Sequence, residues 1–89
     1  MYLNLGQNEI VSEHRIIGIF DLDNASYGKH TRNFLKDAEN NGSVISVSEE
    51  LPKAFVLTQE FGMDRVYLTQ FSASTLEKRF SGAAEKAGV

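Results

Sequence analysis

Residues 1–24, MYLNLGQNEIVSEHRIIGIFDLDN, decide the fold of this chain. A short apolar run at residues 2–5 leads into residues 6–8, whose types favour a tight turn because glycine reaches positive φ without steric cost. The chain then returns in a second apolar run, so the pattern predicts a hairpin. A polar segment at residues 12–15 interrupts the pattern, and residues 16–20 resume it without alternation. Such a run predicts a strand that is covered on both faces.

The segment after this strand has the pattern of a helix with one apolar face. Asn24 or Ser26 is suited to cap the first turn, and the helix is expected to run to about Asn40. Its apolar residues, which share one narrow face at helical spacing, are Tyr27, Phe34, Leu35 and Ala38. Asn41 and Gly42 then provide a stop signal, because asparagine and glycine accept the left-handed conformation that often ends a helix.

Three further strands are expected between this helix and the next. Residues 43–48 form a short apolar strand, and the turn at residues 49–52 holds the only proline, which cannot donate to a sheet ladder. Residues 53–60 contain four successive apolar side chains, a second run that is typical of a strand covered on both faces. The turn at residues 61–64 leads back into a strand at residues 65–69.

The last helix is indicated by a capping box, in which Ser74 is the cap and Glu77 follows three residues later. Its apolar stripe comprises Leu76, Phe80, Ala83, Ala84 and Ala87, and the small alanines suit close packing on a sheet or on a neighbouring subunit. The expected order of elements is therefore β-β-β-α-β-β-β-α. Because two helices are too few for a doubly wound parallel sheet, this order predicts an α+β domain with a mainly antiparallel sheet of about five to six strands.

The composition is that of a small chain without cysteine. Its 89 residues are expected to form a single domain, residues 1–89, whose thin core favours burial against further copies, so we expect a homo-oligomer. The absence of cysteine excludes a disulfide framework and a thiolate zinc site. No apolar run reaches the ~20 residues of a membrane span, and the amino terminus lacks a signal-peptide pattern. We therefore expect a cytoplasmic protein that does not associate with membranes.

Three cations gather in one segment and a fourth stands alone in another, although the net charge is −3. Lys29, Arg32 and Lys36 follow one another in a segment without acidic residues, where they form either a DNA-facing patch or an ordinary solvated helix face. Arg15 lies alone between two apolar runs. Its guanidinium group is suited to contact phosphate through paired donors, or to form a salt bridge with a neighbour such as Glu13.

The residues that carry catalytic chemistry are sparse. Asp21 and Asp23 are similar to the first motif of haloacid-dehalogenase-type phosphatases, in which one aspartate attacks phosphate and Mg²⁺ lies between carboxylates. Those enzymes need a longer doubly wound domain, so we expect both side chains to serve the next turn or helix cap. His14 and His30 are expected to face solvent. With no phosphate-binding glycine loop and no nucleophile elbow, we expect no enzyme activity, metal, cofactor or small-molecule substrate.

Several short motifs are unspecific when taken singly, but their order and spacing in so short a chain are informative. They are MYLNLG at residues 1–6, VS at 11–12, RIIGIFD at 15–21 and SASTLEKR at 72–79. Together they resemble the small bacterial RemA/RemB-like extracellular matrix regulatory proteins, and the RemB (YaaB-type) branch most closely. The similarity extends from Met1 to about Phe80 and is weakest in the middle.

The resemblance implies a bacterial transcription regulator of extracellular matrix and biofilm genes. Members of the RemA branch bind DNA and look like ring-shaped homo-oligomers, in which a repeated basic rim multiplies weak, salt-sensitive phosphate contacts. Arg15 matches an arginine of that branch that is thought to face DNA. An arginine pair of the same branch falls here on Glu49 and Glu50, and acidic side chains at such a rim repel the DNA backbone.

The sequence is therefore compatible with three functions. A DNA-binding regulator that acts as a homo-oligomer follows from the family, from Arg15 and from the three helix cations. An oligomeric protein-interaction module of the same family, without DNA binding, follows from the acidic turn and the negative net charge. An aspartate-dependent phosphatase, the remotest of the three, rests on Asp21 and Asp23 alone.

Overall fold

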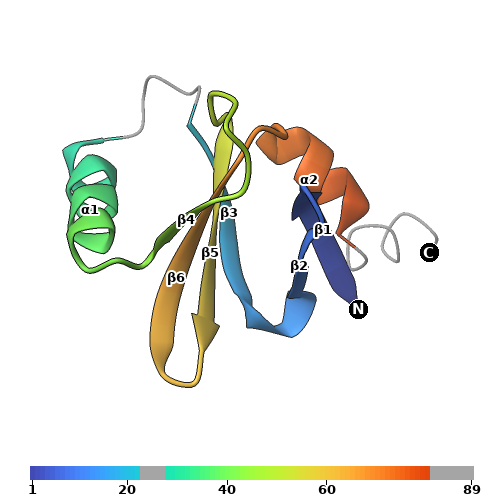
Figure 1. Cartoon of the computed structure of the whole chain (residues 1–89), viewed down its shortest axis with the longest axis horizontal. Coiled ribbons are helices and arrows are strands. Elements are labelled where there is room, and N and C mark those ends of the chain that lie inside the picture. The colour runs from blue at the N-terminus through green and yellow to red at the C-terminus, as the bar shows by residue number, and fades with distance from the viewer. Residues whose placement is uncertain (23–27, 81–89) are drawn as a thin grey trace.

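The fold is α+β, with six strands and two helices in the predicted order (Figure 1). The structure is a computed structural model that describes residues 1–22 and 28–80. Its elements are β1 (Tyr2–Gly6), β2 (Glu9–Ser12), the 3₁₀ turn η1 (Glu13–Arg15), β3 (Ile16–Asp21), α1 (Lys29–Asn40), β4 (Val44–Ser46), β5 (Ala54–Glu60), β6 (Met63–Thr69) and α2 (Ala73–Arg79). Neither described helix is long and apolar enough to cross a membrane.

The six strands are divided between two sheets. β1 and β2 form an antiparallel pair by themselves, and the other four strands lie in the order β3-β5-β6-β4. All pairings in the larger sheet are antiparallel except that of β4 with β6, which is parallel. The prediction of a mainly antiparallel fold is thus confirmed. β4 is shorter than the segment 43–48 that the sequence predicted.

Two tight hairpins shape the molecule. In the first, Gly6, Gln7 and Asn8 all have positive φ, as expected for the glycine. In the second, Phe61 and Gly62 connect β5 to β6 with φ of 52° and 78°, and the residues on either side of them are paired. Positive φ at both central residues is the signature of a type I′ turn, whose twist matches that of the flanking strands.

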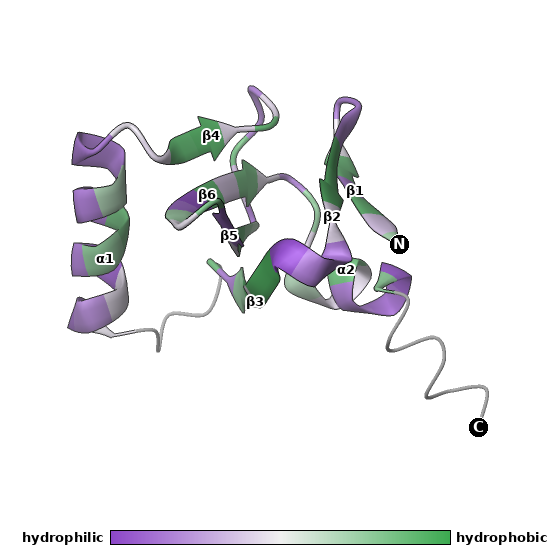
Figure 2. Cartoon of the chain, turned by 90° about the horizontal axis from the view of Figure 1, so that it is seen from below, coloured by the Kyte–Doolittle hydropathy of each residue, from purple (hydrophilic) through white to green (hydrophobic). Residues whose placement is uncertain are grey.

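The four-stranded sheet is covered on both faces (Figure 2). On one face lies α1, whose Phe34, Leu35 and Ala38 pack with Phe55 and Val66. The β1–β2 hairpin and α2 cover the opposite face through a cluster that comprises Leu3, Leu5, Val11, Val47, Ala54, Val56, Tyr67, Ala73 and Leu76. Successive residues of β5 contribute to alternate clusters, so the prediction of a strand covered on both faces is confirmed for β5.

The same prediction is wrong for β3. This strand lies at the edge of the sheet, and Ile17 and Phe20 are 57% and 43% exposed. Ile16 and Ile19 pack toward α2, whereas the ring of Phe20 stacks on Phe55 with centroids 4.8 Å apart. A shift of register between Ile16 and Gly18 breaks the regular pairing with β5. An edge strand has neighbours on one side only, so its apolar side chains stay partly uncovered.

The helices begin at other residues than the sequence predicted. α1 starts at Lys29 after Gly28, which makes no side-chain cap, and the two candidate caps near residue 25 lie outside the described residues, as does Tyr27. α2 is capped by Ser72, whose Oγ accepts a hydrogen bond from the Thr75 N–H at 3.2 Å, so the capping box at Ser74 is wrong. The three alanines of the predicted stripe lie outside the described residues. The stop at Gly42 is confirmed by its φ of 74°.

One buried hydroxyl joins the two sheets. The Thr69 Oγ1 atom donates to the carbonyl oxygen of Leu5 at 2.7 Å and accepts from the Phe71 N–H at 3.1 Å. The first contact holds the β1–β2 hairpin against the end of β6, and the second shapes the turn into α2. This fixed hairpin in turn sets the position of η1, which follows directly from β2.

Candidate nucleic-acid interface

Arg15 is the last residue of η1 and lies beside the far end of β5. Its Nη1 atom is 3.1 Å from Oε1 of Glu60, the last residue of β5. The side chain of Arg15 remains 41% exposed, whereas that of Glu60 is only 17% exposed. The sequence allowed either a salt bridge or a phosphate contact for this arginine. In the structure, Arg15 forms an ion pair with Glu60, and its side chain remains partly exposed to water.

A second arginine reaches the same carboxylate. Arg65 on β6 places Nη1 3.6 Å from Oε2 of Glu60, and its side chain is 45% exposed. The neighbouring Tyr67 side chain is the main cause that raises the pKa of Arg65, and the negative charge of Glu60 adds to it. Two cations therefore share one anion. We call Arg15, Glu60, Phe61 and Arg65 the arginine corner.

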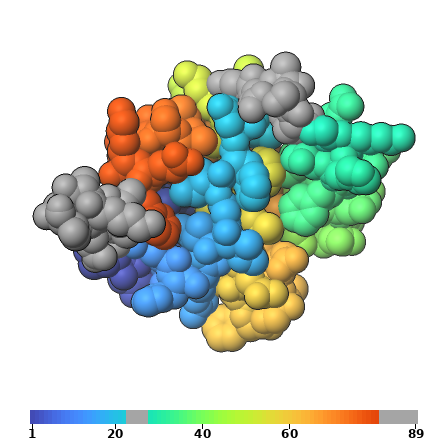
Figure 3. Space-filling view, turned by 180° about the vertical axis from the view of Figure 1, so that it is seen from behind, coloured from blue at the N-terminus to red at the C-terminus, as the bar shows by residue number. Residues whose placement is uncertain are grey.

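Phe61 completes this corner from the tip of the β5–β6 hairpin. It is 90% exposed, and the guanidinium carbon of Arg15 lies 5.0 Å from its ring centroid. Its φ of 52° is unusual for an aromatic residue, and a left-handed non-glycine residue costs on the order of 1–3 kcal/mol of strain. Figure 3 shows the hairpin tip beside the segment around η1. Phe61 and the two arginines are thus exposed at this corner.

Sequence reasoning did not find Arg65 or Glu60. The two are brought together by the two-residue turn at Phe61 and Gly62, which fixes the register of β5 against β6. That register places Arg65 opposite Thr58, two residues along the strand from Glu60. Residues two apart share a face of a strand, so the arginine and the glutamate are diagonal neighbours.

The other three candidate cations form a separate patch. Lys29, Arg32 and Lys36 are all exposed on α1, and their spacing places them on one face of the helix. α1 packs against β4 and β6, whereas η1 packs against β5. In Figures 1 and 3, α1 and the hairpin tip lie at different parts of the surface. The structure brings the helix cations together but does not bring Arg15 to them.

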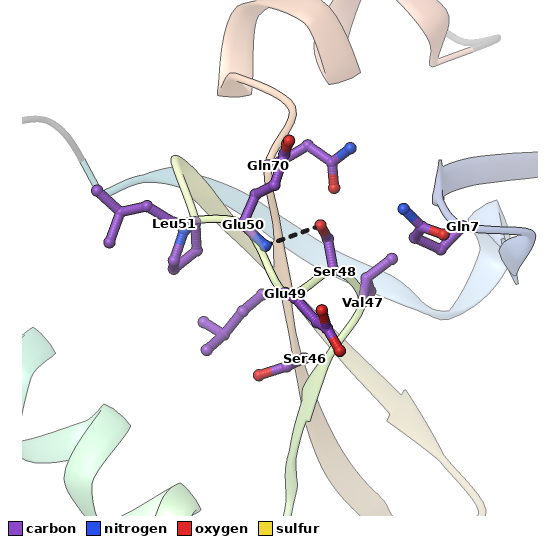
Figure 4. A pocket seen from close by; sticks show the side chains of 10 residues that line it. Gln7, Ser46, Val47, Ser48, Glu49, Glu50, Leu51 and Gln70 are labelled. Carbon is purple, nitrogen blue, oxygen red and sulfur yellow. Dashed lines mark hydrogen bonds between the residues drawn. The ribbon is translucent and has the colours of Figure 1, made fainter.

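The acidic turn lies on the rim of a hollow of about 910 Å³, which is lined by the end of β4, the loop that follows it, and residues from the end of β6 and the β1–β2 turn (Figure 4). Glu49 and Glu50 are both exposed there, and the Glu50 N–H donates to Ser48 Oγ at 3.1 Å. Gln70 also lines the hollow, and its buried Oε1 atom has no hydrogen-bond partner among the described residues. This polar, negatively charged hollow suits a cationic partner better than a nucleic acid.

The remaining candidates do not form a site in the part of the chain that is described. Asp21 is the last residue of β3, and Asp23 lies outside the described residues. His14 and His30 are exposed, as predicted, and they lie on η1 and α1. Among residues 1–22 and 28–80, no group of three or more histidine, aspartate or glutamate side chains is arranged to hold a metal ion.

Comparison with known proteins identifies the family of the chain. A family model described as RemA-like, extracellular matrix regulatory protein A-like, matches residues 2–80, which run from β1 to the end of α2. The chain is also similar to extracellular matrix regulatory protein B of Bacillus subtilis (strain 168), with 34% identity over 79 residues. This match covers 89% of each of the two chains. The chain therefore belongs to the RemA-like family of extracellular matrix regulatory proteins.

Proposed function

We propose that this protein is a cytoplasmic bacterial regulator of extracellular matrix genes, without enzyme activity, that binds duplex DNA as a homo-oligomer. The observation that carries the proposal is the exposed guanidinium group of Arg15 at the arginine corner. An arginine in this position offers paired donors to phosphate, and the neighbouring Arg65 leaves the corner with a net positive charge. Such contacts position a protein on DNA but carry little sequence information.

Assembly is the second part of the proposal. A single corner offers few phosphate contacts, so binding by one subunit is expected to be weak. Repetition of the corner in an oligomer, such as a ring, multiplies these contacts through effective concentration. The exposed apolar side chains of Ile17 and Phe20 on the edge strand β3 support assembly, because a further copy would bury them.

The cations of α1 are proposed as helpers. Lys29, Arg32 and Lys36 form a solvent-facing stripe that is separate from the corner, so they contact DNA only if it passes over both surfaces. Each would then add one further phosphate contact to the salt dependence of binding.

The direct test is fluorescence anisotropy with two unrelated duplexes at low salt. The wild type is expected to bind both with similar affinity, and Arg15→Ala is expected to weaken binding to both equally, by about tenfold or more, because a charge-assisted pair is lost. Arg79→Ala is the matched control. Arg79 also lies over an aromatic ring, at 4.7 Å from the centroid of Phe71, but at the end of α2. If the wild type binds neither duplex, the DNA-binding proposal is wrong.

A second candidate function is an oligomeric protein-interaction module that does not bind DNA. The hollow beside Glu49 and Glu50 favours it, since this acidic surface would repel phosphate. The double substitution Glu49→Arg with Glu50→Arg separates the two candidates. A DNA-binding protein should bind both duplexes more tightly after this change, because repulsion is removed. If the wild type is instead a module without DNA affinity, the double substitution should abolish its binding to a cationic partner, because the hollow becomes basic.

A further inference from the structure

We infer that Arg15 and Arg65 form a two-guanidinium site for one DNA phosphate, and that the Glu60 carboxylate, which pairs with both arginines in the free protein, competes with this phosphate for them. The inference rests on the proposed DNA binding and assigns roles to Arg65 and Glu60 within it. It starts from the geometry of the pair. One Nη1 atom approaches Oε1 of Glu60 at 3.1 Å and the other approaches Oε2 at 3.6 Å.

A carboxylate and a phosphodiester offer similar acceptors to two arginines. Each has two anionic oxygens on one centre, and each accepts donors from separate guanidinium groups. The contact of Arg65 at 3.6 Å is an ion pair that is too long for a hydrogen bond, so its donors on this side are not committed to Glu60. The carboxylate therefore leaves donors of Arg65 available to another anion.

The exposure of the three side chains gives DNA access to the arginines. Both guanidinium-bearing side chains are more than twice as exposed as that of Glu60, so the cations form the outer layer and the anion the inner one. A phosphate that approaches from solvent meets the arginines first. It does not need to cross the carboxylate to reach them.

Each arginine also has a second neighbour at the corner. The guanidinium of Arg15 lies over the ring of Phe61, and Tyr67 lies two residues from Arg65 along β6, on the same face of the strand. Loss of the Glu60 charge should therefore leave both side chains at the corner. We conclude that Glu60 competes with phosphate for the arginines and is not required to position them.

The test measures DNA binding by Glu60→Gln, Arg65→Ala and Arg65→Lys in salt titrations on two unrelated duplexes. Glu60→Gln should bind about 3- to 10-fold more tightly at low salt, because an anion at the contact is removed. Arg65→Ala should bind more weakly, because one of the two guanidinium groups at the phosphate is lost, and its salt slope should fall by less than the roughly 0.9 of a whole phosphate contact. Arg65→Lys should bind more tightly than Arg65→Ala but less tightly than the wild type, since lysine keeps the positive charge but lacks the paired donors of a guanidinium group. Arg79→Ala should resemble the wild type.

Side-chain NMR on the full chain adds a readout that altered stability would not change. Duplex DNA should shift the Nε–Hε signals of Arg15 and Arg65, but not that of Arg79. The inference is overturned if Arg65→Ala binds with the affinity and salt slope of the wild type. It is also overturned if Glu60→Gln weakens binding as Arg15→Ala does, because Glu60 would then be a positioning residue. Failure of the wild type to bind any duplex overturns the proposed function itself, and this site with it.

Discussion

At the scale of single residues, Phe61 shows a conflict between a side chain and its backbone. The type I′ turn at this position favours Asn-Gly, whereas the chain has Phe-Gly with the phenylalanine in the left-handed region. The aromatic ring is almost fully exposed, so burial does not compensate for the strain. Its interaction with Arg15 is the compensating contact that the structure shows, and such a contact contributes about 0.5–1 kcal/mol at an exposed site.

We therefore predict that Phe61→Asn raises the free energy of unfolding by about 0.5–1 kcal/mol, because asparagine relieves more strain than the lost ring contact contributes. Urea unfolding at a fixed protein concentration measures the change. Gly62→Ala is the control of opposite sign, since alanine is strained at a φ of 78° and should destabilise the same turn. A less stable Phe61→Asn variant would show that the phenylalanine is held by contacts other than those described.

The residues also show what the sequence could reveal. Positive φ at Gly6 and Gly42 was predictable, because glycine and its neighbours are the usual residues of such turns. Positive φ at Phe61 was not, since an aromatic residue argues against it. Arg15 was found from its isolated position between apolar runs. Arg65 was missed because its role depends on the register of the hairpin, which follows only from the turn at Phe61.

At the scale of elements, the order of strands and helices was predictable, but their ends and exposures were less so. The apolar pattern of a segment indicates that it forms a strand, but it does not indicate where that strand lies in the sheet. β3 and β5 have similar apolar runs, yet β5 lies between two strands and β3 lies at the edge. The start of α2 was misplaced by two residues because Ser72 and Ser74 both stand near its first turn.

The cap of α2 gives a test at this scale. Ser72→Ala should lower the free energy of unfolding by about 1 kcal/mol, because the Thr75 N–H loses its acceptor. Ser74→Ala is the matched variant two residues away and should change stability by less than about 0.5 kcal/mol, as exposed substitutions usually do. Equal losses in thermal or urea unfolding would contradict the cap that the structure shows. A larger loss for Ser74→Ala would restore the capping box.

At the scale of the whole molecule, the chain is acidic and positive charge is concentrated in small surface regions. The net charge is −3, but the arginine corner and the α1 stripe each carry net positive charge. Long-range attraction to DNA is therefore small, and binding must depend on close contacts repeated in an assembly. The sequence indicated oligomerisation through the thin core of so short a chain, and the exposed part of β3 supports the same proposal.

We predict that the protein in solution has a mass that is a multiple of the 9.9 kDa of one chain. Ile17→Lys on the edge strand should reduce this mass toward that of the monomer, because lysine at a sheet edge opposes association. Leu51→Lys, at an exposed position of the loop before β5, is the control and should leave the mass unchanged. Light scattering that shows a monomeric wild type at micromolar concentration would contradict assembly.

The central claim is that repeated phosphate contacts from an assembled protein hold duplex DNA. It is tested most directly by the slope of log binding constant against log salt concentration for the wild type, measured on two unrelated duplexes. The single phosphate site of one subunit would give a slope of about −0.9. We predict a steeper slope that is the same for both duplexes. No binding at about 50 mM salt, or a slope near zero, would contradict the claim.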